Sequence, residues 1–247
     1  MSTKTAKLPG FFRATLAIAR KELRVLFLSP LAWVFLGAFL FLGGVFFHLG
    51  LAVSGEASLR PLLGNLAVVL LFCLPLVTMR QLAEETRIGT LELLMTAPVP
   101  LWALICGKWL ATMALCSVLL LLTGMYPVIL WMYGEPDPGA LLTSYVGLLA
   151  LCAAYAAAGL FVSSVSKDQM VAGVGTVLLL LPFWLADSAQ ALLPEWMAPV
   201  LQRISVIEHL RGFARGVIDT ADIVYFGGFV VLFLFLTWRS LESRRWR

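Results

Sequence analysis

Charged residues are scarce in this chain. Lysine and arginine account for 18 of its 247 residues and aspartate and glutamate for 14, so charged residues make up 13% of the sequence. That is about half the charged share of a typical soluble domain. Hydrophobic residues make up 61%, and the mean hydropathy is +0.94. The composition predicts a polytopic membrane protein, whose net charge of +4 relates to orientation in the bilayer rather than to nucleic-acid binding.

The motifs of nucleotide binding and hydrolytic catalysis are also missing. The sequence contains no GxxxxGK[ST] phosphate loop, no HExxH and no GxSxG. There are only two histidines: His48 lies near the end of an apolar run, and His209 lies in a connection between runs. We expect both to form interfacial hydrogen bonds. The chain is therefore expected not to be an enzyme and to hold no metal or cofactor of its own.

Cysteine is sparse and is not arranged for metal or redox chemistry. The four cysteines are Cys73, Cys106, Cys116 and Cys152, and no two form a CxxC pair. All lie in or beside apolar runs. We therefore expect them to be small buried hydrophobic residues.

Six apolar runs approach or exceed the ~20 residues that cross a hydrocarbon core of ~30 Å. They cover residues 31–51, 62–79, 109–131, 141–165, 170–186 and 223–238. Only residues 166–169 separate the fourth run from the fifth, which predicts a tight helical hairpin. These runs contain no acidic or basic residue, and this argues against a membrane protease or a proton-coupled carrier.

The basic residues predict the orientation. If both termini are cytoplasmic, 14 lysine and arginine residues fall inside and 4 fall outside, as the positive-inside rule requires. The predicted fold is an all-α polytopic membrane protein with six transmembrane helices, N-in and C-in. It is one transmembrane domain over 1–247, in which a cytoplasmic elbow helix (1–30) precedes the spans (31–238) and a basic cytoplasmic tail (239–247) follows them.

The segment before the first span has an amphipathic pattern. One side carries apolar residues at helical spacing: Phe12, Leu16, Ala19, Leu23 and Leu26. Another side carries the basic residues Arg13, Arg20, Lys21 and Arg24. This pattern predicts a helix lying flat in the cytoplasmic interface, with its basic face toward anionic headgroups. Ser29 and Pro30 then break the helix; the alternative is a solvated extension of the first span.

The connection between the second and third spans contains a short charged stretch, EETRIGTLELLMTAPVP, over residues 84–100. Glu84 and Glu85 favour the start of a helix, because the helix dipole is positive there. Leu91, Leu94 and Met95 would form an apolar face, and prolines follow. This stretch is interpreted either as a short rigid helix that contacts another protein or as a solvated loop.

The connection over residues 187–222 contains a second apolar stripe. Its members are Ile204, Ile207, Leu210, Phe213 and Val217, at helical spacing. The stripe predicts an extracytoplasmic helix that either lies on the outer membrane surface or enters the membrane and returns. We expect this outer helix, through Ile207, Leu210 and Phe213, to pack against membrane or a partner and to support an external gate or a periplasmic protein.

Three segments resemble type-2 ABC exporter permeases. EETRIGTLELLMTAPVPLWALICGKWLA is similar to the connection between the second and third spans of that family, and RKELRVLFLSPLAWVFLGAFLFLGG is similar to its elbow helix and first span. ISVIEHLRGFARGVIDTADIVYF, with LESRRWR at the end, resembles the subgroup named for gliding-motility permeases. The permease of the nitrous-oxide-reductase copper-maturation system is similar as well.

The resemblance implies a non-catalytic permease in the bacterial inner membrane. In that family two permeases pair, as a homodimer or with a related permease, and two separate ATP-binding cassette subunits supply ATP and Mg. The stretch at 84–94 would then be the coupling helix. Its expected ATPase contacts are Glu84, Glu85, Arg87, Gly89, Thr90, Leu91, Glu92 and Leu94.

Glycine pairs suggest where two permeases could meet. The candidates are Gly43-Gly44 and Gly173 with Gly175, because small residues let helices approach closely. Three functions follow from the resemblance and the composition together. The first is export of a solute, and the second is mechanotransmission to a periplasmic partner without transport. The third, a secondary carrier or membrane enzyme, lacks the intramembrane acids that it would require.

Overall fold

The computed structural model describes residues 10–54, 60–91, 99–133, 137–190 and 195–245. Within them every regular element is a helix, which confirms the predicted all-α class. Six helical stretches are long and apolar enough to cross a membrane: Pro30–Ala52, Leu62–Ile88, Leu101–Met132, Pro138–Val165, Gln169–Ala189 and Thr220–Arg244. The six predicted spans are therefore confirmed. The tight hairpin is present too, because one helix ends at Val165 and the next begins at Gln169.

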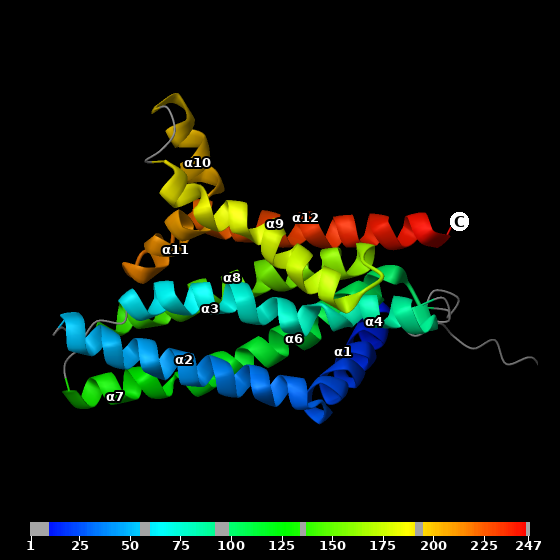
Figure 1. Cartoon of the computed structure of the whole chain (residues 1–247), viewed down its shortest axis with the longest axis horizontal. Coiled ribbons are helices and arrows are strands. Elements are labelled where there is room, and N and C mark those ends of the chain that lie inside the picture. Colours follow the sequence, from blue (N-terminus) through cyan, green and yellow to red (C-terminus); the bar gives the residue numbers. More distant parts are fainter. Residues whose placement is uncertain (1–9, 55–59, 92–98, 134–136, 191–194, 246–247) are drawn as a thin grey trace, which may run out of the picture.

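The N-terminal helix α1 (Phe11–Leu28) is separate from the first span, α2 (Pro30–Ser54). Ser29 has an extended conformation, with φ −80° and ψ 135°, so the helix cannot continue through it. The two helices meet at an angle (Figure 1). This geometry agrees with an elbow helix and not with an extension of the span. All four of its predicted basic residues, Arg13, Arg20, Lys21 and Arg24, are exposed.

The second span is longer than the sequence predicts. Helix α3 (Arg60–Thr78) passes into α4 (Arg80–Ile88) through Met79, whose dihedral angles, φ −57° and ψ −30°, are helical. The third span is also longer: α6 (Leu101–Thr123) begins eight residues before the predicted start at 109, and α7 (Met125–Tyr133) follows it. The charged residues Arg80 and Lys108 marked the predicted ends, but the helices continue through them, and Lys108 is paired inside the bundle.

Helix α8 (Pro138–Val165) lies at the centre of the bundle. It contacts α3, α4, α6, α11 and α12. In its most apolar stretch of 18 residues, 67% is buried. Small residues permit this close packing. At Gly159 even a Cβ would lie 2.1 Å from the Thr78 hydroxyl oxygen, so only glycine fits between α8 and α3. Asp137 caps the start of α8 by accepting a hydrogen bond of 2.9 Å from the amide of Gly139.

Helix α9 (Gln169–Ala189) leads to a projecting segment. Residues Glu195–Met197 (η1) and α10 (Ala198–Ile204) extend away from the bundle, and α11 (Val206–Ala214) returns to it (Figure 1). The last span, α12 (Thr220–Arg245), then runs along the bundle. Helices α1, α4 and the C-terminal end of α12 lie at one end of the bundle, the α4 end; α7, α10 and α11 lie at the other, the α11 end.

Of the glycines proposed as contacts between two permeases, Gly43, Gly173 and Gly175 lie close to other helices of this chain. A Cβ on Gly43 would lie 3.0 Å from the hydroxyl oxygen of Tyr126, which itself donates a hydrogen bond of 2.7 Å to the Leu40 carbonyl. Gly173 and Gly175 similarly face Met79 and Val162. Close approach does explain these glycines, but the approaching helices belong to the same chain.

Candidate functional site

The residues predicted to form one coupling helix are divided by a turn. Glu84, Glu85 and Arg87 lie on α4, which ends at Ile88. Gly89 follows with φ 80°, a left-handed conformation that glycine adopts without the steric cost of a Cβ. A continuous helix over 84–94 is therefore wrong. Thr90 and Leu91 begin a new helical turn, and Glu92 and Leu94 lie outside the described residues.

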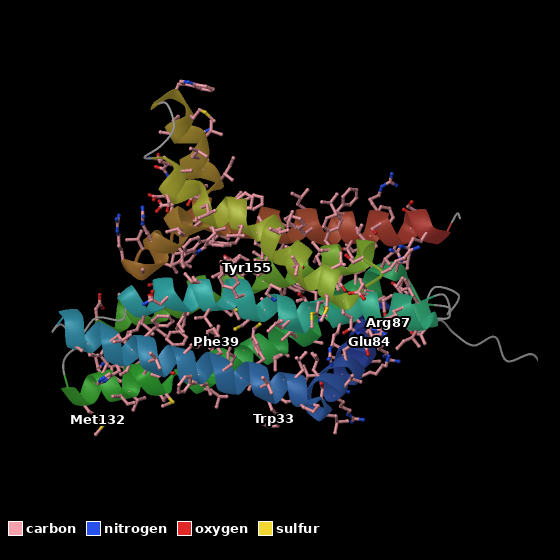
Figure 2. All side chains as sticks on the ribbon, viewed as in Figure 1. Trp33, Phe39, Glu84, Arg87, Met132 and Tyr155 are labelled. Carbon is pink, nitrogen blue, oxygen red and sulfur yellow. The ribbon has the colours of Figure 1, made fainter. Side chains whose placement is uncertain are left out.

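The side chains around this turn face different surroundings. Leu91 is only 4% exposed and belongs to the chain's own core, whereas Ile88 is 66% exposed. Arg87 and Gly89 are exposed as well. Figure 2 shows Glu84 and Arg87 at the α4 end, far from Met132 at the α11 end. The exposed tip of α4 is thus Arg87, Ile88 and Gly89.

A buried charge cluster lies beside this tip. Lys108 of α6 is 1% exposed, and its Nζ lies 2.7 Å from Oε1 of Glu85 on α4. The same Nζ lies 3.2 Å from Oε1 of Glu22 on α1 and donates a hydrogen bond of 2.7 Å to the Gln81 carbonyl. A buried lysine requires such partners, because an unpaired charge in the interior costs several kcal/mol. The cluster therefore joins α1, α4 and α6.

Packing around the cluster brings the three helices together. Gly107 precedes Lys108, and a Cβ on it would lie 2.8 Å from Cβ of Ile18, so α1 sits directly on the α6 backbone. Gln81 donates through Nε2 to the Lys108 carbonyl, at 3.3 Å, and to the Thr112 hydroxyl. The side chains of Glu22 and Glu85 keep 13% and 16% exposure, so water can reach their edges. The result is a polar joint in an otherwise apolar bundle.

This cluster was not predicted from the sequence. The predicted spans 62–79 and 109–131 contain no charge, but their bounds are too narrow: Lys108 lies in α6 and Glu85 lies in the longer second span. Lys108 lies about 10 Å into α6 from its first residue, Leu101, at a rise of 1.5 Å per residue. A signal was present: Pro100 is the last helix-breaking residue before Lys108, and residues 101–107 are apolar, so a helix start at 101 was readable.

At the α11 end, the predicted outer helix is divided by Ser205. Ser205 ends α10 and caps α11, where its hydroxyl oxygen accepts a hydrogen bond of 3.3 Å from the Glu208 amide. Ile204 and Val217 are 39% and 60% exposed, so they do not extend the buried stripe. Only the middle of the predicted stripe packs.

That middle part packs on this chain and not on a partner. Phe213 is 1% exposed and lies against α8, where a Cβ on Gly147 would be 2.8 Å from Cβ of Phe213. The Thr143 hydroxyl donates a hydrogen bond of 2.7 Å to the Phe213 carbonyl. Leu210 is 8% exposed, and Ile207 is partly buried. Phe213 and Leu210 are thus buried within the chain, with Phe213 against α8, and the gate or docking role of this stripe stays a prediction.

Polar contacts anchor α11 further. His209 Nδ1 lies 2.6 Å from Oδ1 of Asp222, and its ring stacks on Tyr225 with centroids 4.0 Å apart. His209 is therefore a hydrogen-bonding residue, as expected. Arg211 pairs with Asp187 at 2.7 Å and with Glu208 at 2.6 Å. These contacts hold α11 to α9 and α12.

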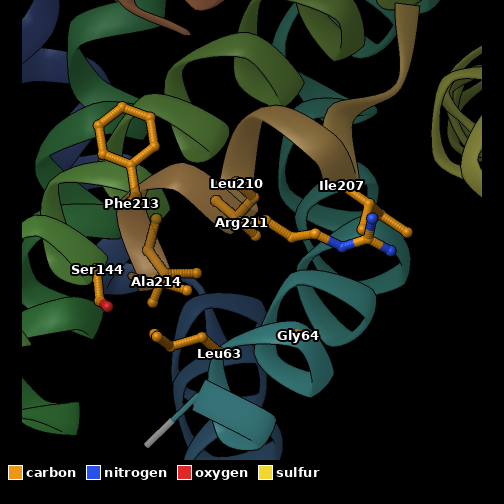
Figure 3. A pocket seen from close by; sticks show the side chains of 9 residues that line it. Leu63, Gly64, Ser144, Ile207, Leu210, Arg211, Phe213 and Ala214 are labelled. Carbon is orange, nitrogen blue, oxygen red and sulfur yellow. The ribbon is translucent and has the colours of Figure 1, made fainter. Parts of the chain in front are cut away.

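A cavity of about 90 Å³ lies between α11, α3 and α8 (Figure 3). Its lining is almost entirely apolar and includes Leu63, Leu148, Ile207 and Leu210. Ser144 and Arg211 are the polar residues in its lining. Among the described residues no three His, Cys, Asp or Glu side chains gather where they could hold a metal ion. The four cysteines are free thiols, of which Cys116 and Cys152 are buried and Cys73 and Cys106 partly so.

Comparison with known proteins agrees with a membrane transporter. The family model described as "ABC-2 family transporter protein" matches residues 52–205, more than half of the chain. The chain is 28% identical over 141 residues to the "Probable multidrug ABC transporter permease YbhR" of Escherichia coli strain K12. The protein of that name from Escherichia coli O157:H7 is similar to the same degree. The match covers 56% of this chain and 37% of the relative.

Proposed function

The chain belongs to the ABC-2 family of transporter proteins, and we propose that it is the transmembrane subunit through which a separate ATPase drives movement across the inner membrane. ATP and Mg bind in that partner, an ATP-binding cassette protein present in two copies. A second permease, identical or related, completes the assembly. The permease named for multidrug transport among its relatives favours export of a solute as the work performed.

The observation that carries this proposal is the exposed tip of α4. Ile88, a large apolar side chain with 66% exposure, lies between the charged Arg87 and the turn at Gly89. An exposed apolar residue beside a charged one is typical of a protein contact, in which one packed anchor supplies most of the binding energy. The tip also lies at the α4 end, which the basic residues predict to be cytoplasmic.

The contact residues expected from the sequence are revised accordingly. Arg87, Gly89 and Thr90 stay in the proposed ATPase contact, and Ile88 replaces Leu91 as its apolar anchor because Leu91 is buried. Glu85 belongs to the charge cluster, and Glu84 faces a groove beside α1. Glu92 and Leu94 follow the turn and stay in the proposal.

The charge cluster connects the tip of α4 mechanically to the rest of the bundle. Helix α4 continues α3, so displacement of the tip acts along the second span. Lys108 passes the same displacement to α6, and Glu22 passes it to α1. Binding of ATP changes the preferred position of the tip, and the permease then shifts between two states that differ in affinity for the ATPase conformations.

Co-purification tests the contact. The chain is co-expressed with its proposed ATP-binding cassette partner, and recovery of that ATPase is measured for wild type, Ile88→Asp and Arg87→Ala. Loss of a central anchor costs more than ~2 kcal/mol, so Ile88→Asp should lower the affinity at least about 30-fold, and Arg87→Ala much less.

Val217→Asp is the matched control. Val217 is 60% exposed, lies between α11 and α12 at the opposite end, and should leave recovery unchanged. Full recovery of the ATPase by Ile88→Asp, with wild-type ATP turnover, would show that the tip of α4 is not the contact.

Mechanotransmission is the second candidate, and the projecting segment favours it. Trp196 is 74% exposed and Val200 is 55% exposed in η1 and α10, which extend from the α11 end (Figure 1). Such a segment can contact a periplasmic protein. ATP-dependent solute loss from vesicles that contain the permease and ATPase alone favours export; strict dependence on a periplasmic partner, with no solute moved, favours mechanotransmission.

A further inference from the structure

A groove lies between α1 and α4, beside the charge cluster. Its volume is about 250 Å³, close to the lower end of the ~300–1,000 Å³ of small-molecule sites. One part of its lining is apolar and comes from Val25, Leu26, Leu31 and Val77. The other part is charged. The groove therefore presents a polar and an apolar surface to the same occupant.

Both signs of charge line the polar part. Lys21 and Arg80 supply positive charge, and Glu22, Glu84 and Glu85 supply negative charge. The side chains of Arg80 and Glu84 make no hydrogen bond or ion pair with any residue that the structure describes, although the two residues stand four apart on one helix. Unpaired charges of opposite sign on one groove favour a ligand that carries both charges itself.

Two buried oxygens indicate what the ligand must donate. Gln81 is 7% exposed, and its Oε1 is buried with no hydrogen-bond donor in the described part of the chain. Oε2 of Glu85 is also buried and has no hydrogen-bond donor among the described residues. Both Gln81 and Glu85 line the groove. A buried acceptor left without a donor costs ~1–3 kcal/mol, so an occupant with N–H donors is favoured.

The groove lies where the apolar span becomes charged. Residues 62–79 contain no charged side chain, and Arg80, Glu84, Glu85 and Arg87 follow. Helix α1 on the other wall is amphipathic, with exposed Phe12 and Leu16 as well as its basic residues. This change of polarity marks the level of the lipid headgroups, and amphipathic helices lie at that level.

We propose that the groove between α1 and α4 binds a zwitterionic aminophospholipid, a lipid with a phosphate and a primary ammonium group. The phosphate lies against Arg80 and Lys21. The ammonium group donates to Glu84 and to the buried oxygens of Gln81 and Glu85. The glycerol and the start of the acyl chains lie against Leu26, Leu31 and Val77. This lipid therefore stabilises the junction of α1 and α4 beside the charge cluster and contacts the cluster through Glu85.

Headgroup chemistry distinguishes this ligand from other lipids. A phosphatidylcholine carries the phosphate but has no N–H donor, and a phosphatidylglycerol carries the phosphate without a cation. Free phosphoethanolamine has both charged groups but no apolar part. The proposal requires the N–H donors, the phosphate and the acyl region together.

The test measures lipids retained by the purified full chain. Protein in a mild detergent is mixed with equal amounts of phosphatidylethanolamine, phosphatidylcholine and phosphatidylglycerol, and bound lipid is counted by native mass spectrometry. We expect phosphatidylethanolamine to be retained about tenfold over each of the others, in line with two or three charge-assisted contacts. Free phosphoethanolamine at the same concentration should not compete.

Two variants separate the two charges. Glu84→Gln should remove the preference for phosphatidylethanolamine over phosphatidylcholine, and Arg80→Gln should lower retention of all three lipids about fivefold. Neither residue has a partner in the described chain, so neither change should unfold the protein. Arg87→Gln on the same helix lies outside the groove and should retain lipid as the wild type does.

Several outcomes would overturn the proposal. Equal retention of the three lipids would show that lipid surrounds the protein without a specific site. A preference for phosphatidylglycerol would show a site for anionic lipid. Competition by free phosphoethanolamine shows a soluble ligand. If the co-expressed ATPase abolishes lipid retention, the groove is part of the ATPase contact. Failure of the ATPase test on Ile88 leaves the lipid result unaffected, because that residue does not line the groove.

Discussion

Replacing Lys108 by methionine tests the charge cluster directly. Methionine keeps much of the length of the lysine side chain but removes the Nζ that contacts Glu85, Gln81 and Glu22 at 2.7, 2.7 and 3.2 Å. Removing one partner of a buried ion pair costs ~3–5 kcal/mol, because the remaining charge stays buried without compensation. Water can partly hydrate the two glutamates, which are 16% and 13% exposed. We therefore expect the lower end, about 3 kcal/mol.

The measurement is the free energy of unfolding in mixed micelles, followed by far-UV circular dichroism. A second variant, Glu85→Gln, and the double variant complete a mutant cycle. The double variant should be more stable than the sum of the single effects predicts, with a coupling of ~1–3 kcal/mol. Lys167→Met is the matched control: Lys167 is exposed between α8 and α9, so its loss should change stability by less than ~0.5 kcal/mol.

Two results would refute the reasoning. An unfolding free energy of Lys108→Met equal to that of the wild type would mean that the lysine is not buried among the three helices. Additive effects of the two single variants would mean that Lys108 and Glu85 do not interact.

Two further predictions concern packing and topology. Gly147→Ala should lower the melting temperature, because the added Cβ would lie 2.8 Å from Phe213. The control Gly37→Ala, whose Cβ would have nothing within 4 Å, should leave the melting temperature unchanged or raise it. Equal melting temperatures of the two variants would contradict the contact between α11 and α8. Single cysteines in a cysteine-free background test orientation: a membrane-impermeant reagent added outside should label position 137 but not positions 166 and 243. External labelling at 166 or 243 would reverse the predicted topology.

Burial of Phe213 also changes how the outer helix can be tested. The sequence predicts that Phe213→Asp would disrupt a gate while leaving ATPase binding intact. In the structure this change places a carboxylate against Gly147 at a site with 1% exposure, so it should destabilise the fold. A gate role therefore requires changes at exposed positions such as Ile204 or Val217.

The start of the third span near Lys108 shows what could not be predicted from the sequence. Hydropathy placed the start of the third span just after Lys108, since a lone lysine in a bilayer is costly. Its cost is offset by Glu85, which is 23 residues away along the chain, and by Glu22. A single sequence states which charges exist, but their pairing depends on which helices meet. The predicted helix at 84–94 failed for a different, local reason, because Gly89 ends α4 in a left-handed turn.

Some features of this protein follow from the sequence by itself. Run length and composition determined the six spans, since backbone groups in a bilayer must be satisfied within each helix. Ser29 and Pro30 determined the separate elbow helix, and residues 166–169 determined the hairpin, because both are local effects. Tertiary structure alone decided what depends on helix contacts: that Gly43, Gly147 and Gly173 are covered by the same chain, that Leu91 is core while Ile88 is exposed, and that Lys108 joins three helices. Side-chain partners are set by packing between distant segments, and local periodicity carries no information about that packing.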